Sequence, residues 1–218
     1  MLKAIIFDMD GVIIDSEPIH TEIAIAVMRD FGGNPTYEEI NDDFIGTTNR
    51  EMWETLKERH KMDATVDQLL ERHREYKMKR FFEEPVPAID GIESLIRQAR
   101  SRGLKIALAT SSPKYFAEHI LRSAGLFEYF DSLVTADDIS RGKPDPEIYL
   151  KAAQALDLDP ASCIALEDAF LGIKSAKDAG MRVIAYRNPN SGNQDTRQAD
   201  FVVSSIKDIK LDELDRKA

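Results

Sequence analysis

Short apolar runs recur along the chain, and longer segments with apolar residues at helical spacing lie between many of them. Apolar runs of about four to eight residues are typical of buried strands, whereas apolar positions three or four apart are typical of helices. The predicted strands lie at about residues 3–7, 104–109, 132–135, 162–166, 182–186 and 201–203. From residue 90 onward, helices are predicted at about 90–102, 112–124, 170–179 and 205–214, with one more starting at 145. This alternation predicts an α/β fold, a doubly wound, Rossmann-like parallel sheet covered on both faces.

Residues 16–87 interrupt the alternation, because they contain no strand-like run. Apolar spacing there predicts helices at about 19–31, 37–44, 48–60 and 65–83, and prolines at 85 and 87 end the segment. We therefore predict an α/β core of residues 1–15 and 88–218, with a helical cap of residues 16–87 inserted after the first strand. A lid moving on two narrow connections is the default for such an insertion, and a rigidly packed cap is the alternative.

Two helix starts carry a serine just before a proline. Ser16 precedes Pro18 by two residues, and Ser112 directly precedes Pro113. A serine hydroxyl at the N-cap accepts a hydrogen bond from the first turn, where the missing N–H of proline is tolerated. Both serines are therefore predicted N-caps.

Composition narrows the classes of partner and location. The formal net charge of −10 argues against nucleic acid, whose phosphate backbone requires a basic surface. No apolar run approaches the roughly 18 residues of a membrane span. The single cysteine, Cys163, lies in an apolar run, which predicts a buried structural thiol and fits a reducing compartment. We expect a cytoplasmic protein and, since the composition demands no partner, a monomer.

Two carboxylates, Asp8 and Asp10, end the first predicted strand, and Gly11 follows them. Residues two apart in an extended chain point to the same side, so these carboxylates are expected to lie close together. Their repulsion calls for a cation or a shared proton. A solvated acidic turn is the alternative for this stretch taken alone.

Polar residues also follow the next three predicted strands, at the sheet edge where ligands of parallel sheets gather. They are Thr110-Ser111-Ser112, then Lys143, then Glu167-Asp168. Singly, these could be a helix cap, a loop lysine and an acidic turn. Jointly, carboxylates beside hydroxyls and a lysine predict a hard-cation site next to an anion site, and Mg²⁺ bridging carboxylates and a substrate phosphate is the simplest interpretation.

Four stretches at these strand ends resemble the haloacid dehalogenase-like hydrolase superfamily, in the branch of the β-phosphoglucomutases and small sugar-phosphate phosphatases. They are Phe7-Asp8-Met9-Asp10-Gly11, Leu108-Ala109-Thr110-Ser111, Gly142-Lys143-Pro144-Asp145-Pro146, and Leu166-Glu167-Asp168 followed by Gly172-Ile173. They stand in the family's order and at its intervals, and the likeness covers essentially the whole core. The cap resembles the family's caps much more weakly.

The resemblance implies a role for each core residue. Asp8 would be the nucleophile that accepts the phosphoryl group, and Asp10 the general acid and base. Thr110 would hydrogen-bond the phosphoryl oxygens, and Lys143 would neutralise the charge between phosphate and nucleophile. The implied Mg²⁺ ligands are Asp8, Asp168 and the backbone carbonyl of Asp10, with Glu167 at or just outside the first shell.

Three branches of the superfamily are set aside on single residues. The founding dehalogenases lack the second aspartate and the metal, whereas this chain has Asp10 and Glu167-Asp168. The related ion pumps have threonine at the position of Asp10. The phosphonate-cleaving relatives require a lysine early in the cap, but no lysine occurs between Lys3 and Lys57.

The choice between mutase and phosphatase depends on the cap. His20 and Gly46 match cap residues of the mutases, although an ordinary helix position is an equal reading for His20. The mutases have lysine where this chain has Ile45, and their loop arginine would be found one residue late, at Arg50. Because these anchors for a second phosphate are altered, the phosphatase reading is favoured. The candidate substrate-binding residues are Glu17, His20, Gly46, Arg50, Ser111 and Ser112.

We therefore expect a Mg²⁺-dependent phosphatase that acts on a small phosphorylated metabolite, such as a sugar phosphate. β-Phosphoglucomutase is the alternative enzyme, and a phosphometabolite-binding protein without turnover is the alternative outside enzymes. Residues 188–199 are rich in Asn, Ser, Gly and Gln, and predict a surface loop to which no function is assigned.

Overall fold

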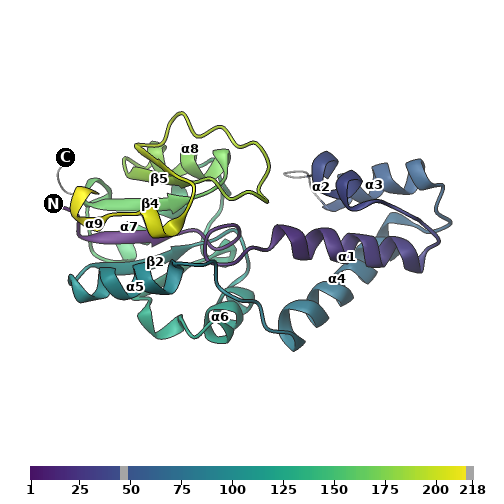
Figure 1. Cartoon of the computed structure of the whole chain (residues 1–218), viewed down its shortest axis with the longest axis horizontal. Helices are drawn as coiled ribbons and strands as arrows, with labels where there is room; N and C mark the ends of the chain where they lie inside the picture. Colours follow the sequence, from purple (N-terminus) through teal and green to yellow (C-terminus); the bar gives the residue numbers. More distant parts are fainter. Residues whose placement is uncertain (45–48, 215–218) are drawn as a thin grey trace. The chain divides into compact units, whose positions relative to one another are not determined.

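The structure is a computed structural model that describes residues 1–44 and 49–214, with the side chains of residues 1–40 and 49–214. The chain divides into two compact units. One, called the α/β unit, consists of Met1–Asp15 and Val86–Ala218, and the other, called the helical unit, is Ser16–Pro85 (Figure 1). None of the helices in the described ranges is long and apolar enough to cross a membrane.

The α/β unit is built on a six-stranded sheet with the order β3-β2-β1-β4-β5-β6, in which every neighbouring pair is parallel. The strands are β1 (Ala4–Phe7), β2 (Lys105–Ala109), β3 (Ser132–Val134), β4 (Cys163–Glu167), β5 (Arg182–Tyr186) and β6 (Phe201–Val203). The predicted doubly wound parallel sheet is confirmed. β1 is central, and all four of its residues are buried, because helices cover both faces of a parallel sheet.

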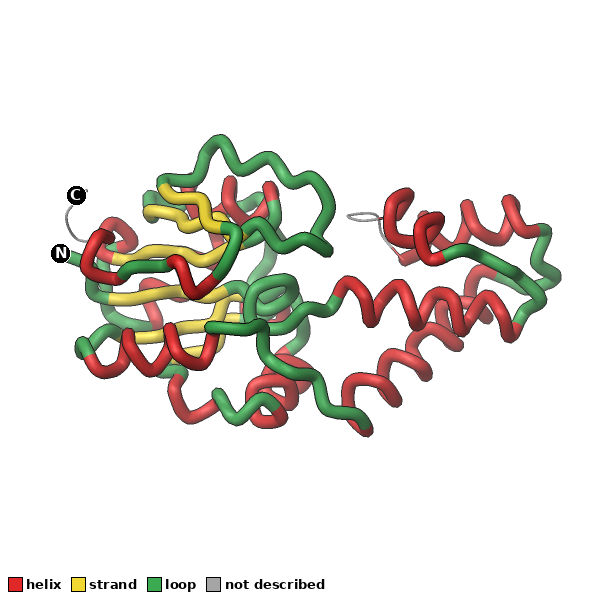
Figure 2. The backbone as a smooth tube through the Cα atoms, in the orientation of Figure 1, coloured by secondary structure: helices red, strands yellow, loops and turns green. Residues whose placement is uncertain are grey.

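Helices pack on both faces of this sheet (Figure 2). On one face, Ile6, Ala107 and Ala165 form a core cluster with residues of α7 (Glu147–Ala155) and α8 (Phe170–Asp178). α5 (Ile92–Ser101) packs against β2 without belonging to that cluster, so it covers the opposite face. The other helical segments are α6 (Lys114–Ser123), α9 (Leu211–Leu214) and the 3₁₀ turns η1 (Phe127–Tyr129), η2 (Ala136–Asp138), η3 (Pro160–Ser162) and η4 (Ile206–Asp208).

The helical unit contains α1 (Glu17–Asp30), α2 (Tyr37–Phe44), α3 (Asn49–His60) and α4 (Val66–Glu83). α1 packs against α2 and α4, and α3 packs against α4. The start of α4 is set by a capping box, in which the Thr65 hydroxyl accepts from the Gln68 backbone N–H at 3.2 Å and the Gln68 side chain accepts from the Thr65 N–H at 2.8 Å. The core of the helical unit is built from large apolar residues that include the fully buried Trp53, Leu56 and Phe81.

Of the two predicted serine caps, Ser16 is confirmed in position and Ser112 is wrong. Ser16 is the N-cap residue of α1, but its hydroxyl forms no cap hydrogen bond, and its backbone is helical (ψ −21°) rather than extended. α6 begins after Pro113, one residue later than predicted, because the Ser112 hydroxyl bonds to Asp10 instead. The single last helix predicted at 205–214 is wrong, since extended backbone at Ile209 (ψ 116°) separates η4 from α9.

Candidate active site

The carboxyl end of β1 carries Asp8 and Asp10 into a tight turn. The Asp8 N–H continues the sheet by donating to the Leu166 carbonyl at 3.0 Å, and Gly11 then reverses the chain with φ +82°. A Cβ at Gly11 would lie 2.0 Å from Asp168 Oδ2, so any larger residue would collide with that carboxylate. Glycine is required here both for its conformation and for the close approach.

Lys143 lies between two of the carboxylates. Its Nζ donates to Asp8 Oδ1 and to Glu167 Oε1, each at 2.6 Å, and to the Ala109 carbonyl at 3.2 Å. Burial acts to lower the pKa of Lys143, but the Asp8 and Glu167 carboxylates more than offset it and hold that pKa well above its usual value. The lysine is therefore a cation in the folded protein, with only 10% of its side chain exposed.

Glu167 is enclosed by donors on both of its oxygens. Oε1 accepts from Lys143 and from the Tyr149 hydroxyl (2.8 Å), while Oε2 accepts from the backbone N–H groups of Asp168 (3.1 Å) and Ala169 (3.2 Å). A Cβ at Gly172 of α8 would lie 1.8 Å from Oε1, so that glycine leaves room for the carboxylate. Sequence reasoning missed Tyr149, because in a helical pattern it is indistinguishable from a core aromatic residue.

Asp8, Glu167 and Asp168 form a buried acidic trio whose potential ligand atoms all lie within 4.8 Å of one another. Burial raises the pKa of Asp8 well above its usual value, and burial followed by the Glu167 charge raises the pKa of Asp168 to about 7. Lys143 alone therefore does not balance the negative charge of the cluster. An all-oxygen donor set with excess negative charge fits a hard divalent cation.

Asp10 is not part of the trio, and its carboxylate is hydrogen-bonded to the segment that follows β2. Its Oδ2 accepts from the Ser112 hydroxyl at 3.1 Å, and the Ser112 N–H donates to Thr110 Oγ1 at 3.0 Å. Thr110 is buried, Ser111 is exposed, and Asp10 is half-buried. β1 lies between β2 and β4, where the strand order changes direction, and crevices at such points bind ligands.

The predicted substrate residues of the cap lie in the helical unit. Glu17 and His20 are half-buried on α1, and the His20 ring lies 5.5 Å from the Phe81 ring. Arg50 is exposed and forms an ion pair with Asp67 at 2.8 Å. Gly46, together with the neighbouring Ile45, lies outside the described residues.

The loop after β5 lies at the surface as predicted, but some of its residues turn inward. Asn188 and Ser191 are buried, and both bond to the site. The Asn188 side-chain amide donates to the Gly11 carbonyl at 3.0 Å, and the Ser191 hydroxyl donates to Asp168 Oδ2. Polar composition predicted exposure, and no periodic signal in such a segment reveals which residues turn inward.

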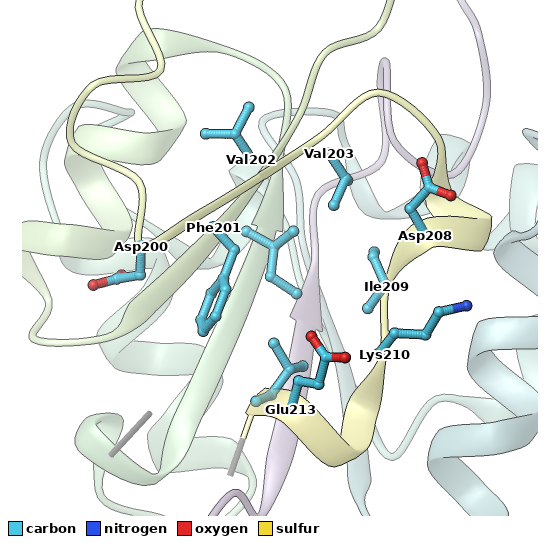
Figure 3. A pocket seen from close by; sticks show the side chains of 10 residues that line it. Asp200, Phe201, Val202, Val203, Asp208, Ile209, Lys210 and Glu213 are labelled. Carbon is cyan, nitrogen blue, oxygen red and sulfur yellow. The ribbon is translucent and has the colours of Figure 1, made fainter. Parts of the chain in front are cut away.

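Hollows lie in the described part of the α/β unit. One of about 330 Å³ lies near β6, and Figure 3 shows the side chains that line it. Its Asp200 is already engaged, accepting from Lys177 and from the Val183 N–H, and none of the acidic trio lines it. A second hollow, of about 200 Å³, borders Asp168 and the loop after β5.

Comparison with known proteins agrees with this geometry. A family model described as haloacid dehalogenase-like hydrolase matches residues 5–186. The chain is 36% identical over 183 residues to a phosphorylated carbohydrates phosphatase of Thermotoga maritima, covering 84% of each chain. It is 33% identical over 217 residues to the β-phosphoglucomutase of Bacillus subtilis, covering 97% of this chain and 93% of that one.

Among solved structures, CbbY from Rhodobacter sphaeroides in complex with phosphate superposes with a TM-score of 0.81 at 27% identity, over 99% of this chain and 100% of that chain. The chain belongs to the haloacid dehalogenase-like hydrolase family, and it is an enzyme.

Proposed function

We propose that the protein is a Mg²⁺-dependent phosphatase that hydrolyses a small phosphomonoester, with a sugar phosphate as the expected substrate class. The observation that carries the proposal is the 2.6 Å ion pair of Lys143 with Asp8 beside the carboxylates of Glu167 and Asp168. An anionic nucleophile cannot approach a phosphate dianion unless most of that charge is cancelled. Lys143 supplies part of the cancellation.

In the proposed reaction, a carboxylate oxygen of Asp8 forms a bond to phosphorus while the bond to the ester oxygen breaks. Asp10 gives its proton to the departing alcohol, and then takes a proton from the water that attacks the aspartyl phosphate. Cleavage of that acyl phosphate restores Asp8 and releases inorganic phosphate. Thr110 holds phosphoryl oxygens during both steps.

Asp8, Asp168 and the backbone carbonyl of Asp10 are the proposed ligands of Mg²⁺, which when bound supplies positive charge to the phosphoryl oxygens. Glu167 is proposed to lie just outside the first shell. Its two oxygens already accept from four protein donors, including Lys143 and Tyr149. Its role is then to hold Lys143 in place.

The helical unit is proposed to act as a cap that selects the substrate through Glu17, His20, Gly46 and Arg50, together with Ser111 and Ser112 of the α/β unit. We place the enzyme in the cytoplasm because its one cysteine, Cys163, is free and buried, as is usual for a reducing compartment. The proposed partner is the small phosphorylated substrate alone.

β-Phosphoglucomutase activity is the second candidate, supported by the relative of that name in Bacillus subtilis. The phosphatase is favoured because the arginine nearest to the mutase anchor, Arg50, is exposed and paired with Asp67 within the helical unit. A mutase requires basic groups free to hold a second phosphate, whereas water as acceptor requires none.

The test is a panel of phosphorylated metabolites, assayed for phosphate release with Mg²⁺ and with EDTA. An assay for conversion of β-glucose 1-phosphate to glucose 6-phosphate is run beside it. Phosphate release from one class of ester, lost in EDTA, is the expected result. Isomerisation without release would favour the mutase, and no turnover of any ester would favour a binding protein.

A further inference from the structure

The loop that follows β5 contacts the candidate site at three separate points. The Asn188 amide bridges the Gly11 carbonyl (3.0 Å) and Asp15 Oδ1 (3.3 Å). Ser191 donates to Asp168, and Gln194 accepts from the Phe170 N–H at 3.0 Å, at the start of α8. The loop therefore holds the segments on either side of the acidic trio: the turn after β1 and the turn after β4.

The carboxylate of Asp168 is restrained through its Oδ2 atom. Oδ2 accepts from the buried Ser191 hydroxyl, and the position that a Cβ of Gly11 would take lies 2.0 Å from the same oxygen. A buried hydroxyl on one side and the absence of a side chain at Gly11 on the other therefore set the orientation of this carboxylate.

Hydrogen bonds from neighbouring residues of the loop restrain the backbone around Ser191. Its backbone carbonyl accepts from Gln194 Nε2 at 2.8 Å, and the Asn190 side chain next to it donates to Asp15 Oδ2 at 2.6 Å. A hydroxyl fixed in this way costs little further conformational entropy when it orientates a ligand. The arrangement is more than a chance contact of a surface loop.

We propose that Ser191 is a positioning residue for the metal ligand Asp168, and that the loop from Asn188 to Gln194 is the frame that holds it. The proposal rests on the proposed function, in which Asp168 binds Mg²⁺. Loss of a group that hydrogen-bonds to a metal ligand typically changes metal affinity by about 10- to 100-fold. If the Ser191 hydroxyl is removed, water from the hollow beside the loop can take its place. We therefore expect a change in Mg²⁺ affinity near the lower end of this range, about 10-fold.

The test compares Mg²⁺ binding to the wild-type protein and to Ser191→Ala, by isothermal titration calorimetry without substrate. We expect the dissociation constant for Mg²⁺ to rise by about 10-fold, while kcat at saturating Mg²⁺ is retained. Ser191→Thr keeps the hydroxyl and should bind Mg²⁺ more tightly than Ser191→Ala. The matched controls, Asn193→Ala in the same loop and Ser101→Ala on α5, should bind Mg²⁺ as the wild type does.

The melting temperature of each variant, with and without Mg²⁺, separates positioning from a purely structural role. A lower melting temperature for Ser191→Ala with an unchanged Mg²⁺ dissociation constant would overturn the proposal. If Ser191→Ala does not fold, Gln194→Ala decides: an affinity equal to that of the wild type would overturn it, and a weaker affinity would support it.

Failure of the inference can be told apart from failure of the proposed function. A wild-type protein that hydrolyses no ester and binds no Mg²⁺ would overturn both. A wild-type protein that binds Mg²⁺ and hydrolyses esters, beside a Ser191→Ala variant of equal affinity, would overturn only the positioning role.

Discussion

The two units bury polar groups in opposite ways. In the α/β unit, Lys143 donates to the buried carboxylates of Asp8 and Glu167, each at 2.6 Å. In the helical unit, both ring nitrogens of the buried His73 and the indole nitrogen of Trp53 have no hydrogen-bond partner among the described residues. The two rings lie edge to face, with centroids 5.8 Å apart. One unit keeps charge inside, and the other keeps a titratable group neutral.

The two units differ in whether their buried titratable groups carry charge. Burial, and after it the nearby His20 and Lys77, lower the pKa of His73 to about 4, so it is uncharged near neutral pH and packs as an aromatic residue. Burial likewise favours the neutral forms of Asp8 and Asp168, because it raises the pKa of each carboxyl, whereas the carboxylates of Asp8 and Glu167 hold the pKa of Lys143 well above its usual value and keep it charged. Charge that is costly to bury is retained where phosphoryl transfer requires it.

Replacement of Asp8, the proposed nucleophile, should give the largest effect. We expect Asp8→Asn to lower turnover by about 10⁴-fold or more, since its loss removes the covalent step. The fold should persist, because the substitution removes a charge whose burial is unfavourable. Phosphate release and the melting temperature measure the two effects. Substantial Mg²⁺-dependent turnover by this variant would remove the nucleophile assignment.

Replacement of Asp10, the proposed general acid and base, should give the second largest effect. Asp10→Asn is expected to slow turnover by about 10²- to 10⁴-fold, as is typical for loss of a proton-transfer group. The matched control is His73→Leu, which changes a titratable group of the helical unit and should leave kcat close to that of the wild type. Equal rates for the wild type and Asp10→Asn would contradict the assignment.

Replacement of Lys143 should lower the stability of the α/β unit. Lys143→Met leaves Asp8 and Glu167 unpaired, and breaking a buried ion pair in this way costs about 3–5 kcal/mol of stability. Denaturant unfolding of the metal-free protein measures the loss. We expect added Mg²⁺ to restore part of it, because a divalent cation binds to the same carboxylates. A variant as stable as the wild type in EDTA would show that the pairing contributes little.

The smallest predicted effect is a pair of opposite pH dependences in the metal-free protein. The folded state holds the Asp168 pKa near 7, above the ordinary 3.8, so the folded state binds more protons between these values. Its contribution to stability therefore falls as pH rises from about 4 to about 7. The pKa of His73 is about 4 in the folded state instead of 6.5, so the unfolded state binds more protons between these values. The contribution of His73 to stability therefore rises as pH rises from about 4 to 6.5.

Two variants separate these contributions, by denaturant unfolding in EDTA at several pH values. Asp168→Asn should show a steeper gain in stability between pH 4 and 6.5 than the wild type, and His73→Leu a shallower one. Each difference should reach on the order of 1 kcal/mol per pH unit. Identical slopes in all three proteins would mean that neither group is perturbed.

Much of the fold could be predicted because it depends on local patterns. The parallel sheet followed from short apolar runs that alternate with helical periodicity, and each strand lies within a few residues of its predicted place. The clustering of Asp8, Lys143, Glu167 and Asp168 was also predictable, since the carboxyl ends of parallel strands share one edge. The structure brings these four residues together.

Contacts between distant residues could not be read from such patterns. Ser112 carries every signal of an N-cap, yet its hydroxyl bonds to Asp10, which is 102 residues away. Tyr149 reads as a core aromatic, and only the packing of α7 against the sheet brings its hydroxyl to Glu167. In both cases the hydrogen-bond partner is distant in the sequence, so only the folded chain brings it within reach.

Residue type and spacing along the chain are sufficient to predict which polar residues follow the strands and what chemistry to propose for them. The way in which these residues are held depends on the tertiary structure. It placed Asn188 and Ser191 of an unremarkable polar loop against Gly11 and Asp168. The reason is physical: a hydrogen bond depends on position in space, and polar composition specifies only that a loop can form one.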